Sequence, residues 1–250
     1  MKKVLITFGD EKYFKSIELL KKTAYETGGV ECVQSYSPES LKDGDFWKKN
    51  SFILSRPRGA GYWIWKPYII MRRMETLNDG DIVLYSDAGL KVIDNLDPLF
   101  NIAQTDINGG KVLFKLPAVS VPHHKAKTWT KRDCFVLTGA DYPGYWEADM
   151  GNGAVSLWRK SEKNIEFLKE WLRFLRDPRI VTDDPNIAGK PNFLEFRDHR
   201  HDQSVLTILS IKHDLEMFRD PTQYGNEELN QFTNSPYPQL FHHHRNFKHK

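Results

Sequence analysis

The carboxylate of Asp87 stands at a place in the sequence where it could bind a metal ion or a phosphate. It follows the apolar residues 82–84, which the turn residues Asp79 and Gly80 introduce. A short unbroken apolar run is typical of a strand covered on both faces, as in a parallel sheet. Ligands of open α/β sheets bind beyond the carboxyl ends of such strands. Asp87 is therefore a candidate ligand-binding residue, although an aspartate here could equally begin a turn.

Residues 56–66 read RPRGAGYWIWK and combine three kinds of side chain that suit a phosphorylated ligand. The cations are Arg56, Arg58 and Lys66, the glycines are Gly59 and Gly61, and the large aromatic residues are Tyr62, Trp63 and Trp65. Glycines let a backbone approach a phosphate, cations neutralise its charge, and an aromatic face can stack on a base or a sugar. We expect this stretch to line a binding pocket. The alternative is a packed aromatic loop whose arginines are solvated.

Further carboxylates lie in two later segments. Asp202 lies in the sequence RHDQS, next to Gln203 and directly before an apolar helical pattern. A carboxylate at a helix N-terminus is stabilised by the helix dipole, so Asp202 is either a site residue or an ordinary cap. Glu147 and Asp149 lie in a glycine- and aromatic-rich loop. These carboxylates are further candidate site residues.

The elements that must position these residues begin with a strand over residues 4–8. Apolar residues at helical spacing from Phe14 to Ala24 predict a helix that ends at Gly28-Gly29, and residues 30–36 predict a second strand. The polar sequence from there to Asn50 is typical of a loop. No G-x-G-x-x-G follows the first strand, so a standard dinucleotide fingerprint is absent.

The later elements follow the same alternation. The sequence predicts helices from Pro67 to Leu77 and from Ser161 to Leu175, a strand over 111–116 and an exposed loop over 177–192. Thr130 and Asp133 could begin a helix, although residues 134–137 alone could equally form a strand, and we favour the helix. The repeated order predicts a single α/β domain over residues 1–250, with a mainly parallel central sheet flanked by helices.

Composition excludes several classes of protein. The 250 residues carry a formal net charge of +3, spread along the chain, which gives no nucleic-acid signal. The two cysteines lie far apart, so neither a zinc site nor a disulfide framework is indicated. We expect the N-terminal residues to form a first strand rather than a signal peptide. No apolar run approaches the ~18 residues of a membrane-spanning helix. We expect a cytoplasmic location.

Three blocks of sequence resemble the nucleotide-sugar-dependent glycosyltransferases of the GT-A type, whose fold is Rossmann-like. The blocks are GAGYWIWKPYII followed by GDIVLYSDAG (residues 59–70 and 80–89), RHDQSVLTIL (200–209) and FHHHR (241–245). More specifically, the chain resembles bacterial enzymes of surface-polysaccharide synthesis. This resemblance implies a hexosyl transfer from a UDP- or GDP-sugar to a glycan or glycolipid acceptor, with possible peripheral association at the inner face of the membrane.

The resemblance also implies a metal site. GT-A enzymes hold a divalent ion, here Mn²⁺ or Mg²⁺, with an Asp-x-Asp signature that matches Asp87-Ala88-Gly89. Gly89 stands where the second aspartate would be, so Asp87 would hold the ion with another ligand or would contact the ribose. Such enzymes often add a late histidine, and His243 is the candidate among the histidines 242–244.

The remaining roles follow from the same resemblance. Residues 1–115 would mainly bind the donor, and residues 116–250 would contribute the acceptor side and the C-terminal metal contacts. The expected donor-binding residues are Arg56, Arg58, Gly61, Trp65, Lys66, Asp87, Gly89 and Gln203. An inverting enzyme would need a base, with Asp202 first and Asp149 second. The alternatives are a sugar nucleotidyltransferase and a catalytically silent carbohydrate- or nucleotide-binding protein.

Overall fold

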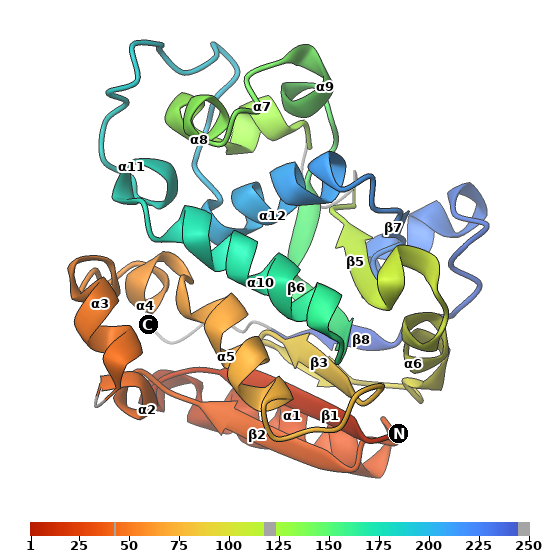
Figure 1. Cartoon of the computed structure of the whole chain (residues 1–250). Coiled ribbons are helices and arrows are strands. Elements are labelled where there is room, and N and C mark those ends of the chain that lie inside the picture. Colours follow the sequence, from red (N-terminus) through yellow and green to blue (C-terminus); the bar gives the residue numbers. More distant parts are fainter. Residues whose placement is uncertain (43, 118–123, 245–250) are drawn as a thin grey trace.

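A computed structural model describes residues 1–42, 44–117 and 124–244, and Arg245 of the FHHHR block therefore lies outside the described residues. A six-stranded sheet runs through the molecule in the order β2-β1-β3-β6-β5-β7 (Figure 1). Its strands are β1 (Lys3–Phe8), β2 (Cys32–Tyr36), β3 (Ile82–Ser86), β5 (Lys111–Lys115), β6 (Gly151–Arg159) and β7 (Met217–Phe218). Only β6 runs antiparallel to its neighbours β3 and β5. The predicted mainly parallel α/β sheet is confirmed.

Two separate apolar cores cover the two faces of this sheet. Alternate residues of β1 point to opposite faces, so Ile6 joins one core and Leu5 the other. The first core packs beneath α5 (Trp65–Met74), α10 (Glu162–Leu175) and α12 (His201–Lys212). The second packs beneath α1 (Phe14–Glu26) and α6 (Asp97–Gln104). The strands are buried on both faces because helices cover both.

A small second sheet returns the end of the chain to the centre of the molecule. β4 (Leu90–Val92) pairs antiparallel with β8 (Phe241–His243). Beyond this pairing, the His244 amide donates to the Gly89 carbonyl at 3.1 Å. Segments about 150 residues apart in the sequence therefore meet at the turn that carries Asp87.

Three expected loops contain regular structure. The polar sequence before Asn50 forms α2 (Glu39–Lys42) and most of α3 (Asp45–Leu54), because Phe46 and Ile53 give α3 a buried apolar side. The segment 177–192 opens with α11 (Pro178–Val181), in which Ile180 is buried. The glycine-rich loop before residue 154 contains α9 (Pro143–Trp146) and the first residues of β6. In α3 and α11, apolar side chains buried against the rest of the protein outweigh the polar composition.

The remaining helices connect the sheet to the site. They are α4 (Gly59–Tyr62), α7 (Ala126–Trp129) and α8 (Arg132–Leu137), with the short 3₁₀ segments η1 (Glu11–Tyr13), η2 (Ile107–Gly109) and η3 (Gln223–Gln231). The favoured helix at residues 130–137 is confirmed by α8, and the Ser161 side chain accepts the amide of Asn164 to cap α10. In the part of the chain that the structure describes, no helix is long and apolar enough to cross a membrane.

Candidate active site

A large cavity of about 1290 Å³ opens at the carboxyl ends of β1 and β3. Residues 8–16 line it after β1, residues 87–89 after β3, residues 152–154 at the start of β6, and residues 199–203 at the start of α12. His243 and His244 also line this cavity. This is the edge at which parallel strands of α/β sheets present their ligand-binding loops. The sequence placed Asp87 at this edge, and the structure agrees.

The stretch 56–66 enters the cavity wall through an unusual left-handed turn. All five residues from Gly59 to Trp63 have positive φ angles, between 49° and 93°. A Cβ on Gly61 would lie 2.6 Å from the Leu54 Cα, so this glycine permits close packing against α3 and does not line the cavity. Left-handed alanine, tyrosine and tryptophan are strained by roughly 1–2 kcal/mol each. Such strain is characteristic of binding and catalytic sites.

Trp65 and Lys66 follow this turn and both line the cavity. The Trp65 ring stacks on Phe8 at a centroid distance of 3.7 Å, and its Nε1 donates to the Gly59 carbonyl at 2.9 Å. Lys66 Nζ lies 2.6 Å from Asp202 Oδ2 and donates to the Gly153 carbonyl at 2.9 Å. Its ammonium therefore faces the first turn of α12.

Asp202 is buried in that first turn and does not cap the helix. The N-cap residue of α12 is Arg200, which makes no side-chain cap bond, so the capping alternative is wrong. The side chains of Lys66 and Asp202 are only 4% and 5% exposed. Burial raises the pKa of Asp202 to about 6, and the nearby charge of Lys66 limits that rise. Next to it, Gln203 donates to the Gly151 carbonyl at 2.7 Å.

Asp87 lies across the same cavity in the turn after β3. Tyr85 donates its hydroxyl to Asp87 Oδ1 at 2.6 Å, and the Asp87 amide donates to Ala154. Beside this turn, His243 packs against Tyr224, and His244 Nε2 is buried without a hydrogen bond to the described residues. Within the described ranges, no group of three or more His, Cys, Asp or Glu side chains could hold a metal ion. A carboxylate and histidines nevertheless share this wall of the cavity.

Asp149 lies elsewhere and is not among the residues that line the cavity. Its carboxylate contacts Lys115 at 2.5 Å, Lys125 at 2.7 Å and His124 at 2.9 Å. Burial alone would raise the pKa of Asp149, but hydrogen bonds from the two lysines lower it below the ordinary value. Glu147 pairs with Lys127 at 2.9 Å. The structure therefore separates Asp149 from Asp202, which the sequence had ranked together.

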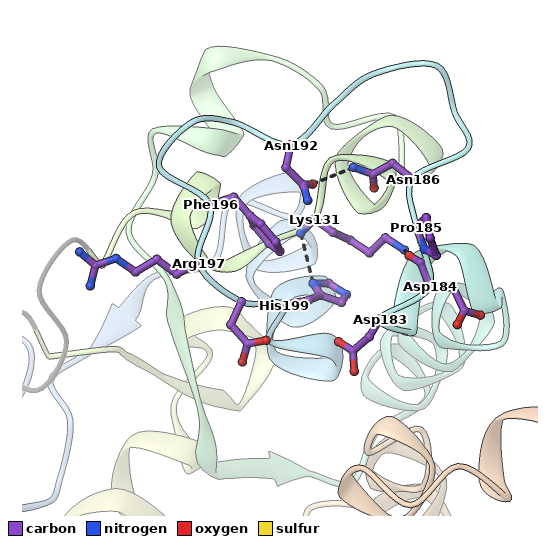
Figure 2. Close-up of a pocket in the computed structure, with 10 residues that line it drawn as sticks. Lys131, Asp183, Asp184, Pro185, Asn186, Asn192, Phe196, Arg197 and His199 are labelled. Carbon is purple, nitrogen blue, oxygen red and sulfur yellow. Dashed lines mark hydrogen bonds between the residues drawn. The ribbon is translucent and has the colours of Figure 1, made fainter.

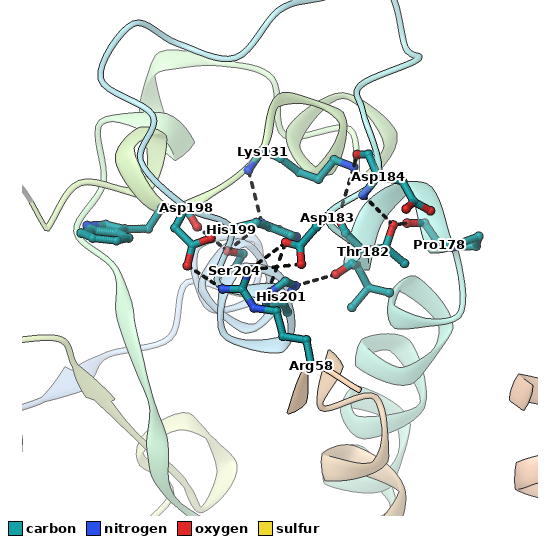
Figure 3. Close-up of polar contacts among 12 residues, drawn as sticks. Arg58, Lys131, Pro178, Thr182, Asp183, Asp184, Asp198, His199, His201 and Ser204 are labelled. Atoms are coloured by element: carbon teal, nitrogen blue, oxygen red, sulfur yellow. Dashed lines mark hydrogen bonds and ion pairs between the residues drawn. The ribbon is translucent and has the colours of Figure 1, made fainter. Parts of the chain in front are cut away.

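The two arginines of the stretch 56–66 face a carboxylate-rich loop. Arg58 lines the rim of the large cavity and binds Asp183 at 3.1 Å and Asp198 at 2.5 Å, as Figure 3 shows. Arg56 is not among the lining residues and lies 3.6 Å from Asp184. The same loop lines a second cavity, of about 150 Å³, together with Lys131 and His199. Figure 2 shows the residues that line it. The arginines link two loops across the rim.

Two polar residues of the cavity wall escaped the sequence analysis. Asp220 is almost fully buried and accepts hydrogen bonds from Thr222 and from the Asn152 side chain. Asn152 in turn accepts the Ala154 amide at 2.7 Å. These bonds fix the segment whose Gly153 carbonyl accepts from Lys66. In the structure Asp220 follows the two-residue strand β7 after one intervening residue, whereas Asp87 directly follows the longer, apolar strand β3, which the sequence does signal.

Comparison with known proteins gives a result at the level of the fold. No protein-family model and no curated protein matches the sequence. Among solved structures, the apo form of mouse xyloside xylosyltransferase 1 superposes with a TM-score of 0.53 at 12% identity, covering 98% of this chain and 97% of that chain.

The apo structure of WbbM, a bifunctional glycosyltransferase, superposes with a TM-score of 0.55 at 9% identity. The match covers 98% of this chain but only 46% of WbbM, so the chain spans less than half of that protein. At these identities the likeness concerns architecture alone. The chain has a fold shared with solved glycosyltransferases.

Proposed function

We propose that this protein is a glycosyltransferase that moves a sugar from a nucleotide-diphosphate sugar to a hydroxyl of an acceptor. The observation that carries the proposal is the large cavity in which Asp87, Gln203 and the Lys66–Asp202 ion pair face one space. Its volume of about 1290 Å³ exceeds the ~300–1,000 Å³ of typical small-molecule pockets, so a donor and part of an acceptor have room together. The shared fold of solved glycosyltransferases supports the same assignment.

The donor site that we propose lies mainly within residues 1–115. Trp65, Asp87 and Gly89 line the cavity from this half, with Arg58 at its rim. Gln203 reaches it from residues 116–250, the half that we propose mainly supplies the acceptor side. Arg56 and Gly61 lie behind the wall, so we propose that they support the donor site through the left-handed turn and its loop contacts.

A divalent cation, Mn²⁺ or Mg²⁺, fits the oxygen-rich wall only if the donor completes its coordination. Asp87 and His243 would be the protein ligands, and the donor's phosphate oxygens would supply more, because such ions are often held by one or two carboxylates and substrate phosphates. When bound, the ion would neutralise charge on the leaving diphosphate. Removing divalent ions should therefore weaken donor binding, which calorimetry with and without a chelator can measure.

Asp202 is the residue that we propose as general base. The acceptor oxygen would bond to the anomeric carbon, the bond from that carbon to the diphosphate would break, and the diphosphate would leave with the bonding electrons. Asp202 would take the acceptor proton. With a pKa raised to about 6, this carboxylate is largely ionised at neutral pH yet remains a better proton acceptor than an ordinary aspartate. Asp149 remains the second candidate, outside the cavity lining.

The wider role that we propose is hexosyl transfer in surface-polysaccharide synthesis, on a glycan or glycolipid acceptor in the cytoplasm or at the inner face of the membrane. These finer assignments rest on the resemblance of the sequence blocks at residues 59–70, 80–89 and 200–209. No contact in the cavity specifies the sugar or the acceptor. Acceptor screening with purified glycans and glycolipids is the direct measurement.

Incubation with a panel of nucleotide sugars tests the reaction class. A glycosyltransferase should hydrolyse its donor slowly to free nucleotide diphosphate, and acceptor should accelerate that release. Release of pyrophosphate from a nucleoside triphosphate and a sugar phosphate would instead identify a nucleotidyltransferase. Binding of donor or glycan with no turnover under any condition would identify a silent binding protein and reject the proposal.

A further inference from the structure

The ammonium group of Lys66 makes close contacts within the protein although Lys66 lines the cavity. It has three N–H donors. One faces Asp202 Oδ2 at 2.6 Å, and a second bonds the Gly153 carbonyl at 2.9 Å. The ammonium also lies 4.9 Å from the centroid of the Tyr85 ring, within the range of a cation–π contact. With its side chain 4% exposed at the cavity wall, Lys66 directs two of its three donors at acceptors within the protein.

We propose that Lys66 is a positioning residue that keeps Asp202 in place and negatively charged, and that it does not contact the diphosphate of the donor. This inference rests on the proposed function for the role of Asp202. It revises the expectation that Lys66, as a cation in a glycine-rich stretch, neutralises the leaving group. The positive charge of Lys66 is instead used within the protein, because the buried pair is neutral as a whole.

The need for such a partner follows from the surroundings of Asp202. Lys66 from α5 is the cation that faces it, Asp87 from the turn after β3 adds a second negative charge, and its own helix contributes the Gln203 amide. Burial and Asp87 both favour the neutral carboxylic acid, which cannot accept a proton. Lys66 opposes both effects, so a carboxylate can persist in a site that water scarcely reaches.

The carbonyl of Gly153 explains why the lysine stays in this position. The Asn152 side chain donates to the Asp220 carboxylate and accepts the Ala154 amide. These two hydrogen bonds fix the backbone on both sides of Gly153. Lys66 lies in α5, and the α5 residues Trp65 and Ile69 pack in the first core. The helix α5 and the segment 152–154 therefore hold the ammonium between them. The ammonium in turn fixes the position of the Asp202 carboxylate.

Donor affinity tests whether Lys66 contacts the phosphates. Asp202→Asn is compared with the double variant Lys66→Met/Asp202→Asn, because the second removes both charges and leaves no unpaired carboxylate. The dissociation constants of UDP and GDP, measured by calorimetry, should agree within about twofold between the two variants. Loss of a charged hydrogen bond to a phosphate would weaken binding by about 10–150-fold. Weakening of that size in the double variant would overturn the proposal.

A measurement without ligand tests whether Lys66 keeps Asp202 negatively charged. It does not depend on the proposed function. Carboxyl ¹³C NMR titration, assigned with Asp202→Asn, should show a higher pKa of Asp202 in Lys66→Met than in the wild type. Lys66→Arg, which keeps the charge, should restore part of the difference. Lys12→Met is the matched control, because Lys12 lines the same cavity from η1 and should leave the pKa of Asp202 unchanged. An unchanged pKa in Lys66→Met would reject the assignment.

Kinetics separate the two roles in the active enzyme. For Lys66→Met we expect kcat to fall and the acid limb of its pH profile to move to higher pH, with little change in the donor dissociation constant. A merely structural lysine would change stability without moving the pH profile. If the wild type transfers no sugar at all, the proposed function fails, while the NMR titration still decides whether Lys66 holds Asp202 charged.

Discussion

Asp202 and Asp149 both have basic partners, yet their carboxylates respond to the fold in opposite ways. Asp149 contacts three basic side chains, is 21% exposed, and has a lowered pKa. Asp202 has one lysine partner, is 5% exposed, and has a pKa raised to about 6. Burial raises both pKa values, but it prevails at Asp202, which has one lysine partner, whereas the basic partners of Asp149 together overcome it.

The largest expected effect is on transfer itself. Asp202→Asn should lower the transfer rate by about 10²–10⁴-fold, because the amide cannot accept the acceptor proton. Asp149→Asn should leave the rate near that of the wild type, since Asp149 does not line the cavity. Initial rates with the donor identified by the panel provide the measurement. Near-normal turnover by Asp202→Asn would move the base to Asp149 or Glu147, or indicate retention of configuration without such a base.

Removing one lysine from each cluster should affect stability unequally. Lys66→Met leaves a buried carboxylate without its counter-ion, which should cost about 3–5 kcal/mol of unfolding free energy at pH 7. Lys115→Met leaves Asp149 with Lys125 and His124 at a more exposed site, so it should cost about 1 kcal/mol or less. Urea unfolding of both variants measures the difference. Equal losses would show that burial does not distinguish the two clusters.

The pH dependence of stability should have opposite signs at the two carboxylates. The raised pKa of Asp202 means that the folded state binds more protons than the unfolded state between about pH 4 and 6, so its contribution falls as the pH rises through that window. The lowered pKa of Asp149 gives a contribution that is present above pH 4 and is lost below it. The stability difference, wild type minus variant, should therefore shrink with rising pH for Asp202→Asn and grow for Asp149→Asn. Slopes of the same sign would contradict both assignments.

The smallest expected effect concerns the arginine at the rim of the cavity. Arg58 and Asp198 are 39% and 40% exposed, so Arg58→Gln should cost about 0.2–1 kcal/mol of unfolding free energy. That cost should decrease in 1 M salt, which screens exposed charges, whereas the cost of Lys66→Met should persist. Unfolding at two salt concentrations checks this difference. A cost of Arg58→Gln that does not change with salt would mean that its contacts act as buried ones do.

Local sequence patterns were enough to predict the order of elements near the N-terminus, the strand that directly precedes Asp87, and the capped helix α10. These features depend on local periodicity and on residues such as Ser161 and Gly28, which act over one or two turns of chain. The same local evidence marked the stretch 56–66 and Asp202 as unusual. It could not tell which of their side chains would face a ligand.

The contacts that those side chains make depend on the tertiary structure. The partner of Lys66 is 136 residues away in the sequence, and its second acceptor is the Gly153 carbonyl. Gly61 serves close packing against α3, and Asp202 faces a cavity instead of capping its helix. Burial and long-range contacts arise from the packing of whole elements, and they alone determine which carboxylate loses its water.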